Sequence, residues 1–435
     1  MHLRIGIKKK KQTTNCIFFM ILFVIFERIL ESFGVPHSVI FLLDIANVYL
    51  FMNLCVGHKV QWIFSTGFVK THIFIFTVGF VVALLNGVSL QLIIWAMRNL
   101  LRFYVFFGAC VAYLNGKDVD DFYELLAKLF YFNVVILLVQ YMMGYRGDFL
   151  GGLFGTVTGA NTYNNVLQII VCTYFVSRWF EKREGAKQPI LIITLSLFIS
   201  VLTETKVFLF EVVLIIGLSV VMIGIVERKY KVLAKGVLIG GLAVLGVFFG
   251  ARYIATLYPS LSNSDFMSVE GLTHILTRES GYTGFGDLNR LTAITSINRL
   301  GLFQSSLSNQ ILGLGLGGAE YSAGISFLQS AFYRSYEYLH YYWFSHAWMY
   351  IECGYLGLIG YMLGFFSIVP TGVKIVRMLK KRGLDASVVV TGMVISILTL
   401  LLYIYNQTLR LEAAYLIYFV FAGIYVKGKE LKING

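Results

Sequence analysis

Residues 345–360 read SHAWMYIECGYLGLIG and decide the fold class of this chain. The stretch places a histidine, His346, where a long polar segment meets an apolar run that looks like a membrane-spanning helix. A titratable imidazole at a boundary between water and lipid is costly to bury without a partner and is well placed for proton transfer. We therefore expect a membrane protein with a functional group at one membrane surface.

Similar apolar runs recur along all 435 residues, of which 57% are hydrophobic and 14% are charged. A soluble protein of this length could not cover so much apolar surface, whereas a bilayer can. The sequence predicts an all-α polytopic membrane protein that forms one integral membrane domain over residues 1–435. The expected spans, about twelve in number, cover residues 14–33, 37–57, 71–90, 92–114, 122–144, 162–180, 189–204, 207–226, 234–254, 347–370, 387–406 and 411–427.

The net charge of +13 comes from 36 Lys and Arg against 23 Asp and Glu. With a cytoplasmic N-terminus, the predicted topology places 24 of the 36 basic residues in cytoplasmic segments, 8 on the opposite side and 4 within spans. The short basic loops 178–187, 228–235 and 374–382 then all face the cytoplasm, as the positive-inside rule requires. The excess of basic residues is therefore explained by membrane topology and not by nucleic-acid binding. Both termini are expected to be cytoplasmic.

One connection is far longer than the others. It covers residues 255–346, between the ninth and tenth spans, and lies on the outer face in this topology. The segment is too rich in apolar and aromatic residues for disorder, and a lone long loop of this kind is usually functional. Its aromatic run from Tyr333 to Trp348 suits either sugar rings or an aromatic belt at the membrane interface, which is the commoner arrangement.

Three cations of the predicted outer face are candidates for binding an anionic headgroup or a diphosphate. Lys206 lies in a tight turn between two spans, and Arg290 and Arg299 flank an amphipathic segment of the long loop. Arginine presents a planar fork of donors to phosphate oxygens. Alternatively, each cation caps a helix or pairs with a nearby acid such as Glu204 or Asp287.

Two further features suit a reaction centre. His346 is a candidate general base, because a neutral imidazole can accept a proton from a hydroxyl at ambient pH; alternatively it only anchors its span, and His340 is a weaker candidate. Arg98 and Arg102 lie four residues apart on one face of a predicted span. Charges at that depth face a protein cavity or a partner, and the possible partners are Asp44, Glu27 and Glu211.

Four motifs follow one another between residues 145 and 370. They are Gly151-Gly152-Leu153-Phe154-Gly155 with Asn161 and Asn164, then Leu202-Thr203-Glu204-Thr205-Lys206, then Asn289-Arg290 with Ile311-Leu312-Gly313-Leu314-Gly315, and finally Ser345-His346 with Glu352, Gly354 and Gly357. In their order and their predicted outer-face placement, they resemble the motifs of the bacterial O-antigen polymerase/ligase family of membrane glycosyltransferases.

The resemblance implies a donor and a place of reaction. The donor would be an oligosaccharide on undecaprenyl diphosphate, transferred at the outer face of the bacterial plasma (inner) membrane. Lys206 with Arg290 or Arg299 would stabilise the leaving diphosphate, and His346 would deprotonate the acceptor hydroxyl. Other residues that could line the cavity are Arg98, Arg102, Asn161, Asn164 and Glu352.

The function that follows is a repeat-unit polymerase of O-antigen (lipopolysaccharide), capsule or exopolysaccharide. The alternatives are an O-antigen ligase with a lipid A-core acceptor, and a polysaccharide or small-solute transporter, which would need helices broken near mid-membrane. The expected partners are membrane lipid and a flippase and chain-length regulator of the same pathway. No metal, cofactor or nucleic acid is expected, because the sequence has no acidic metal cluster and its five cysteines show no metal-site spacing.

Overall fold

The computed structural model describes residues 2–205, 207–228, 281–283, 286–303, 306–322 and 324–433, and within these ranges the side chains of residues 10–431. The predicted span at 234–254, the first part of the long loop and Lys206 lie outside the described residues. No strand occurs within the described residues, whose regular structure is helical. The predicted all-α class is therefore confirmed for this part of the chain.

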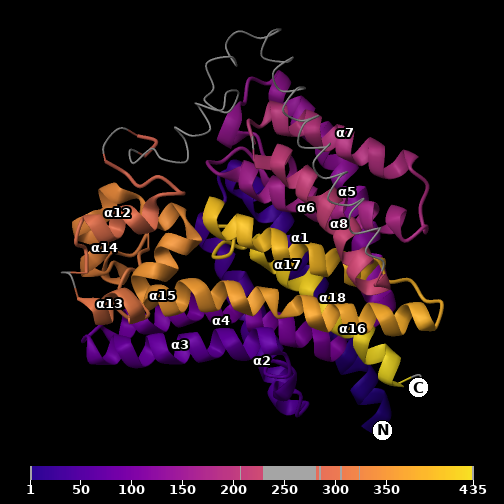
Figure 1. Ribbon diagram of the computed structural model, residues 1–435, viewed down its shortest axis with the longest axis horizontal. Helices are drawn as coiled ribbons and strands as arrows, with labels where there is room; N and C mark the ends of the chain where they lie inside the picture. The colour runs from indigo at the N-terminus through magenta and orange to yellow at the C-terminus, as the bar shows by residue number, and fades with distance from the viewer. Residues whose placement is uncertain are drawn as a thin grey trace.

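The helices follow the apolar runs of the sequence closely (Figure 1). Their bounds are α1 (His2–Ser32), α2 (Phe41–Val56), α3 (Gly67–Leu85), α4 (Leu90–Tyr113), α5 (Gly116–Met142), α6 (Ala160–Phe180), α7 (Lys187–Leu202), α8 (Val207–Glu227), α12 (Ala293–Arg299), α13 (Leu307–Leu312), α14 (Ala331–Tyr336), α15 (Ser345–Phe366), α16 (Ile368–Lys381), α17 (Ser387–Tyr405) and α18 (Ala414–Ile433). Several start at side chains that cap the free N–H groups of the first turn. Thr66 caps α3, and Asn115 and Asp118 form a capping box at α5.

Eight helical stretches in the described part of the chain are long and apolar enough to cross a membrane. They are Lys10–Ser32, His37–Val56, Gly67–Leu85, Leu90–Tyr113, Gly116–Met142, Val207–Glu227, Ser345–Lys381 and Ser387–Tyr405. The stretch Ser345–Lys381 contains both α15 and α16, which lie end to end in Figure 1. The protein is therefore a polytopic α-helical membrane protein, as the composition predicts.

Two predicted spans form helices with a different character. α6 contains Asn164, Asn165 and Gln168, and α18 ends in a basic segment, so both are less apolar than the eight stretches above. Both are also unusually buried: residues 163–177 of α6 and 414–424 of α18 have almost no exposed surface. These helices consequently meet protein neighbours on nearly every side, which allows them to hold polar side chains that a lipid-facing helix could not.

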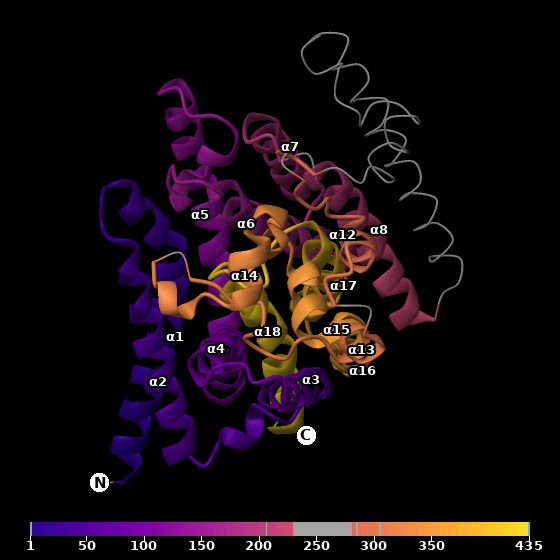
Figure 2. The ribbon, with the colours of Figure 1, turned by 90° about the vertical axis from the view of Figure 1, so that its left-hand side faces the viewer.

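The helices pack as a bundle around α17, α18 and α6. α18 lies against α4 and α17, α6 lies against α8 and α17, and α15 packs along α3. Figure 1 shows α12, α13 and α14 gathered at one end of the bundle, away from the C-terminus. We call this end the loop end. Figure 2 looks onto it and shows α12, α14, α15 and α17 close to its centre.

α15 is broken at Gly354, whose backbone angles are φ 61° and ψ −159°. The glycine-rich segment 313–318 fills the break. The backbone N–H of Leu314 donates to the carbonyl of Ile351 (2.8 Å), and that of Gly315 donates to the carbonyl of Glu352 (2.9 Å). The last carbonyls of the first half of α15 are thus satisfied by backbone from another part of the chain, as helix ends require.

We expect Gly315→Ala to destabilise the protein by about 2 kcal/mol or more. Gly315 has φ +92°, and a Cβ there would lie 2.2 Å from the backbone nitrogen of Ala83 in α3. Strained backbone and overpacking each typically cost about 1–3 kcal/mol. Thermal unfolding in detergent measures the effect, and Gly324→Ala is the matched control, because a Cβ at Gly324 would meet nothing within 4 Å. Equal unfolding midpoints for the two variants would contradict this account of the loop.

Candidate functional site

Arg290 follows a turn at the loop end that a buried carboxylate holds together. Asp287 accepts hydrogen bonds from the backbone N–H of Thr283 (3.0 Å), from its hydroxyl (2.7 Å) and from the backbone N–H of Tyr282. Burial by itself would raise the pKa of Asp287, but these hydrogen bonds to the ionised form lower it below its usual value. The carboxylate of Asp287 is therefore stabilised by hydrogen bonds within its own turn. These hydrogen bonds fix the backbone that leads to Arg290.

The side chain of Arg290 lies among aromatic rings. Its guanidinium carbon is 3.9 Å from the ring centroid of Tyr405, 4.8 Å from that of Tyr282 and 5.9 Å from that of Phe344. We call these three rings the aromatic collar. The Nε atom of Arg290 is buried and has no hydrogen-bond partner. The backbone of Arg290 also contacts the imidazole of His346, so the two predicted site residues lie side by side.

His346 lies in the first turn of α15 and is 4% exposed. The start of this helix is fixed by Ser345, whose backbone N–H (3.0 Å) and hydroxyl (2.9 Å) both donate to the carbonyl of Asn406. The Nδ1 atom of His346 is buried without a partner. His72 in α3 differs, because its two ring nitrogens bond the hydroxyl of Tyr104 and the carbonyl of Tyr361. The contacts of the His346 ring are instead with the backbone of Tyr403 and Arg290.

His340 is the second histidine of the loop end. It has a left-handed backbone with φ 48°, and its ring stacks on Trp343 at a centroid distance of 4.0 Å. Its Nδ1 atom is likewise buried without a partner. The structure gives no contact between His340 and Arg290, whereas His346 has one. The preference for His346 over His340 as the base stays a prediction.

The short connection between α17 and α18, residues 406–413, reaches several parts of the site, and we call it the α17–α18 linker. Arg410 from this linker donates to both carboxylate oxygens of Glu320, at 2.9 and 2.7 Å. It also lies 3.2 Å from the ring centroid of Trp348, two residues after His346. The same carboxylate of Glu320 accepts from the amide of Asn99 in α4 (2.9 Å). The linker thus joins the described part of the long loop to the membrane helices.

Glu412, also in the α17–α18 linker, binds side chains of α4 and α6. One of its oxygens accepts from Arg102 (2.8 Å) and the other accepts from the hydroxyl of Tyr163 (2.9 Å). Tyr163 in turn accepts from Arg28 of α1 (3.3 Å). Arg102 also donates to the backbone carbonyl of Arg410 (2.8 Å). These contacts tie the linker to α1, α4 and α6, so its backbone has little freedom to move alone.

Two of the predicted cavity residues, Arg98 and Arg102, form ion pairs with carboxylates of the protein. Arg98 pairs with Asp44, one of the partners that the sequence suggests. Arg102 pairs with Glu412, which the sequence analysis does not consider, and not with Glu27, Glu211 or Asp44. Both arginines are thus held in place by carboxylates.

The remaining predicted residues have structural contacts of their own. Asn161 donates to Asp148 (2.7 Å) at the surface, and buried Asn164 accepts from Asn133 (2.8 Å). Glu352 accepts from the backbone N–H groups of Gly317 (3.0 Å) and Ala319 (3.3 Å), which anchors the glycine-rich segment.

Arg299 is exposed at the end of α12. Arg290, by comparison, contacts the imidazole of His346 through its backbone. Of the two arginines that the sequence leaves open, the structure places Arg290 with the histidine. Lys206 lies outside the described residues, so its position relative to the two stays a prediction.

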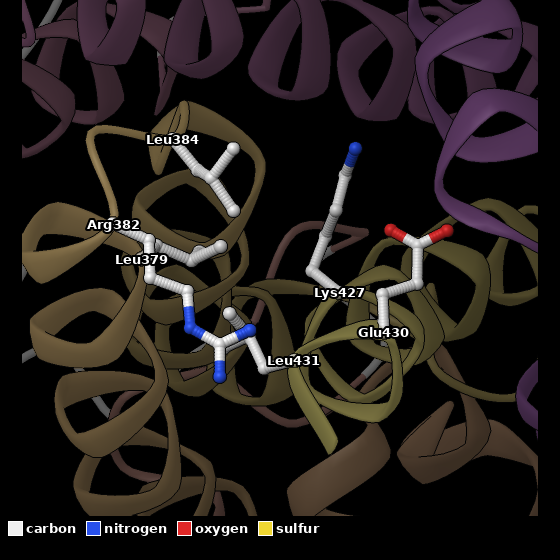
Figure 3. Close-up of a pocket in the computed structure, with 6 residues that line it drawn as sticks. All are labelled: Leu379, Arg382, Leu384, Lys427, Glu430 and Leu431. Carbon is white, nitrogen blue, oxygen red and sulfur yellow. The ribbon is translucent and has the colours of Figure 1, made fainter. Parts of the chain in front are cut away.

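The hollow drawn in Figure 3 lies elsewhere, between the end of α16 and the end of α18. Its lining includes Arg382, Lys427 and Glu430, of which the last two are engaged with α5: Lys427 donates to Asp120 (2.9 Å) and Glu430 accepts from the backbone of Gly116 (2.6 Å). The hollow therefore belongs to the packing of the opposite end of the bundle.

In the part of the chain that the structure describes, no group of three His, Cys, Asp or Glu is placed to hold a metal.

Sequence reasoning missed the residues of the α17–α18 linker. Arg410 counts there only as one of eight outer-face cations, and Glu412 falls at the edge of a predicted span. The available signal is the polar segment Asn406-Gln407-Thr408 followed by Arg410 and Glu412 between two strongly apolar runs. Opposite charges in so short a connection indicate partners within the protein.

No family model matches this sequence, and no curated protein matches it. The likeness to the polymerase/ligase family therefore depends on the four motifs and on their placement.

Proposed function

We propose that this protein is a polysaccharide repeat-unit polymerase that takes its glycan from undecaprenyl diphosphate. The observation that carries the proposal is the contact between Arg290 and His346, 56 positions apart in the sequence. A cation that pairs with no carboxylate among the described residues and an imidazole whose Nδ1 atom is unpartnered suit the two charges that develop in glycosyl transfer. They are the negative charge of the leaving diphosphate and the proton of the attacking hydroxyl.

The reaction that we propose has one group-transfer step. The acceptor hydroxyl oxygen forms a bond to the anomeric carbon of the donor sugar, while the bond from that carbon to the diphosphate oxygen breaks. His346 takes the hydroxyl proton, and undecaprenyl diphosphate leaves with the electron pair. Arg290 stabilises the growing negative charge on the diphosphate because its N–H groups bind phosphate oxygens in a planar fork.

The proposal includes the twelve-span topology, with the loop end on the outer face and both termini in the cytoplasm. We expect reporter tags at Lys10, Lys182 and Lys380 to give a cytoplasmic signal and a tag at Tyr336 to give an outer signal. The reason is the excess of basic residues in the short loops of the opposite end. A cytoplasmic signal from Tyr336 would place the site where undecaprenyl-linked donors are assembled and not where they are polymerised, and would contradict the proposal.

The transporter alternative has one structural observation to account for, the broken helix α15. In a transporter, the carbonyls freed by such a break coordinate the substrate or coupling ion. Here the carbonyls of Ile351 and Glu352 accept from Leu314 and Gly315. The break is therefore occupied by the protein's own backbone, which favours the enzyme. An O-antigen ligase would use the same donor and the same two residues with a different acceptor.

The mutation that tests the proposed donor site is Arg290→Ala. Losing a charge-assisted contact to phosphate costs about 1.5–3 kcal/mol, so we expect polymer formation to fall roughly tenfold to a hundredfold while the protein remains in the membrane. Arg299→Ala should lose less, and Lys206→Ala should resemble Arg290→Ala. The measurement is the chain-length distribution of surface polysaccharide at matched protein abundance. Arg334→Ala is a matched control, because this arginine is exposed and, among the described residues, donates to the backbone carbonyl of Ser326. Normal chains from Arg290→Ala would refute the diphosphate role.

A further inference from the structure

Arg290 differs from Arg98, Arg102 and Arg410 in the kind of group that holds it. Arg98 pairs with Asp44, Arg102 with Glu412, and Arg410 with Glu320. Within the described residues Arg290 forms no ion pair, and the aromatic collar surrounds its guanidinium instead. Asp287, three residues earlier, is occupied by the backbone and hydroxyl of its own turn.

The difference has a chemical consequence. A carboxylate partner neutralises a guanidinium and occupies the N–H groups that a phosphate would use. An aromatic face attracts the guanidinium through its ring quadrupole but leaves the charge and the N–H edge available. Rings are therefore suited to hold a cation that must later bind an anion. Among the collar rings, Tyr405 lies closest to the guanidinium.

Tyr405 is anchored through its neighbour in the chain. It is the last residue of α17, and the next residue, Asn406, accepts two hydrogen bonds from Ser345 at the start of α15. The ring that holds Arg290 and the turn that carries His346 are thus tied to the same backbone. Tyr282, by comparison, is 50% exposed.

We infer that Tyr405 is a positioning residue: its ring holds Arg290 beside His346, without an ion pair to any carboxylate of the described residues, so that the guanidinium can bind the diphosphate of the lipid-linked donor. The inference rests on the proposed function. It adds the reason why this arginine is the one available for the donor. It assigns the main contact to the aromatic face of Tyr405, whose hydroxyl also lies within hydrogen-bonding reach of the guanidinium.

The test is binding of a short polyprenyl diphosphate to the purified full-length protein in detergent, with the polyprenol of the same length as reference. A cation–π contact contributes about 0.5–2 kcal/mol, so Tyr405→Leu should weaken diphosphate binding roughly twofold to thirtyfold. Tyr405→Phe should recover most of the binding. The double variant Arg290→Ala/Tyr405→Leu should bind no more weakly than Arg290→Ala alone, because the ring acts through the arginine.

A merely structural role of Tyr405 gives different results. Tyr338→Leu, at an exposed aromatic residue of the same end, is the matched control, and thermal unfolding midpoints report any loss of folding. The inference is overturned if Tyr405→Leu binds like the wild type, if Tyr405→Phe is as weak as Tyr405→Leu, or if the effects of Arg290→Ala and Tyr405→Leu add. In those cases the loss with Arg290→Ala still supports the proposed function. Equal binding of diphosphate and polyprenol to the wild type would instead remove the proposed function, and this inference with it.

Discussion

His346→Ala is expected to lower the rate of polysaccharide chain growth by about a hundredfold to ten-thousandfold, the usual cost of removing a general base. The variant should still reach the membrane, because the Nδ1 atom of His346 has no hydrogen-bond partner that the mutation would leave buried and unpaired. The measurement is the chain-length distribution of the polysaccharide, normalised to the amount of protein in the membrane fraction.

His340→Ala is the matched control for this experiment. His340 lies in the same end of the molecule and also has an unpartnered Nδ1 atom, but its ring stacks on Trp343. We expect its loss to leave chain growth close to normal. Normal chains from His346→Ala together with short chains from His340→Ala would move the base to His340.

Arg410→Ala is expected to destabilise the folded protein by about 3–5 kcal/mol. Arg410 is the cationic partner of Glu320, which is 0% exposed, and Glu352 lies 4.0 Å from the same guanidinium. Removing the arginine leaves buried carboxylates without compensation, which is far costlier than the loss of an exposed pair. The thermal unfolding midpoint in detergent should fall sharply, and less protein should accumulate in the membrane.

Two further variants separate charge compensation from simple loss of packing. Arg410→Ala/Glu320→Gln should recover part of the lost stability, because it removes one of the uncompensated carboxylates. Arg334→Ala removes an exposed arginine of the same end and should shift the free energy of unfolding by no more than about 0.5 kcal/mol. If Arg410→Ala were as stable as Arg334→Ala, the buried network around the α17–α18 linker would not contribute to stability as described.

The helical class and the eight apolar stretches that can cross a membrane are predictable in the described residues because long apolar runs determine them. A run such as 207–226 can satisfy its backbone in lipid only as a helix, and α8 lies at Val207–Glu227. The same argument overlooks the break in α15. Gly354 stands in a continuous apolar run, and only the distant segment 313–318 supplies the hydrogen bonds that make a broken helix tolerable there.

The site is less predictable because its contacts connect distant residues. Sequence motifs single out Arg290 and His346, but nothing local separates Arg290 from Arg299, since both are arginines beside the same short helix. Tertiary structure distinguishes them, by placing Arg290 against Tyr405 and His346. The depth of Arg98 and Arg102 in their span predicts that they need partners, yet the partner of Arg102 comes from Glu412, 310 positions away.

The leaflet in which lipid-linked repeats accumulate in a His346→Ala strain tests the central claim most directly. The measurement is a leaflet-resolved assay of undecaprenyl-linked glycan, with the wild type and His340→Ala beside it. If the protein is a polymerase that uses His346 as the base, single repeats should collect on the outer leaflet, because they have crossed the membrane but are not joined. Repeats trapped on the inner leaflet would show that the lost step is transport, and would contradict the glycosyltransferase account.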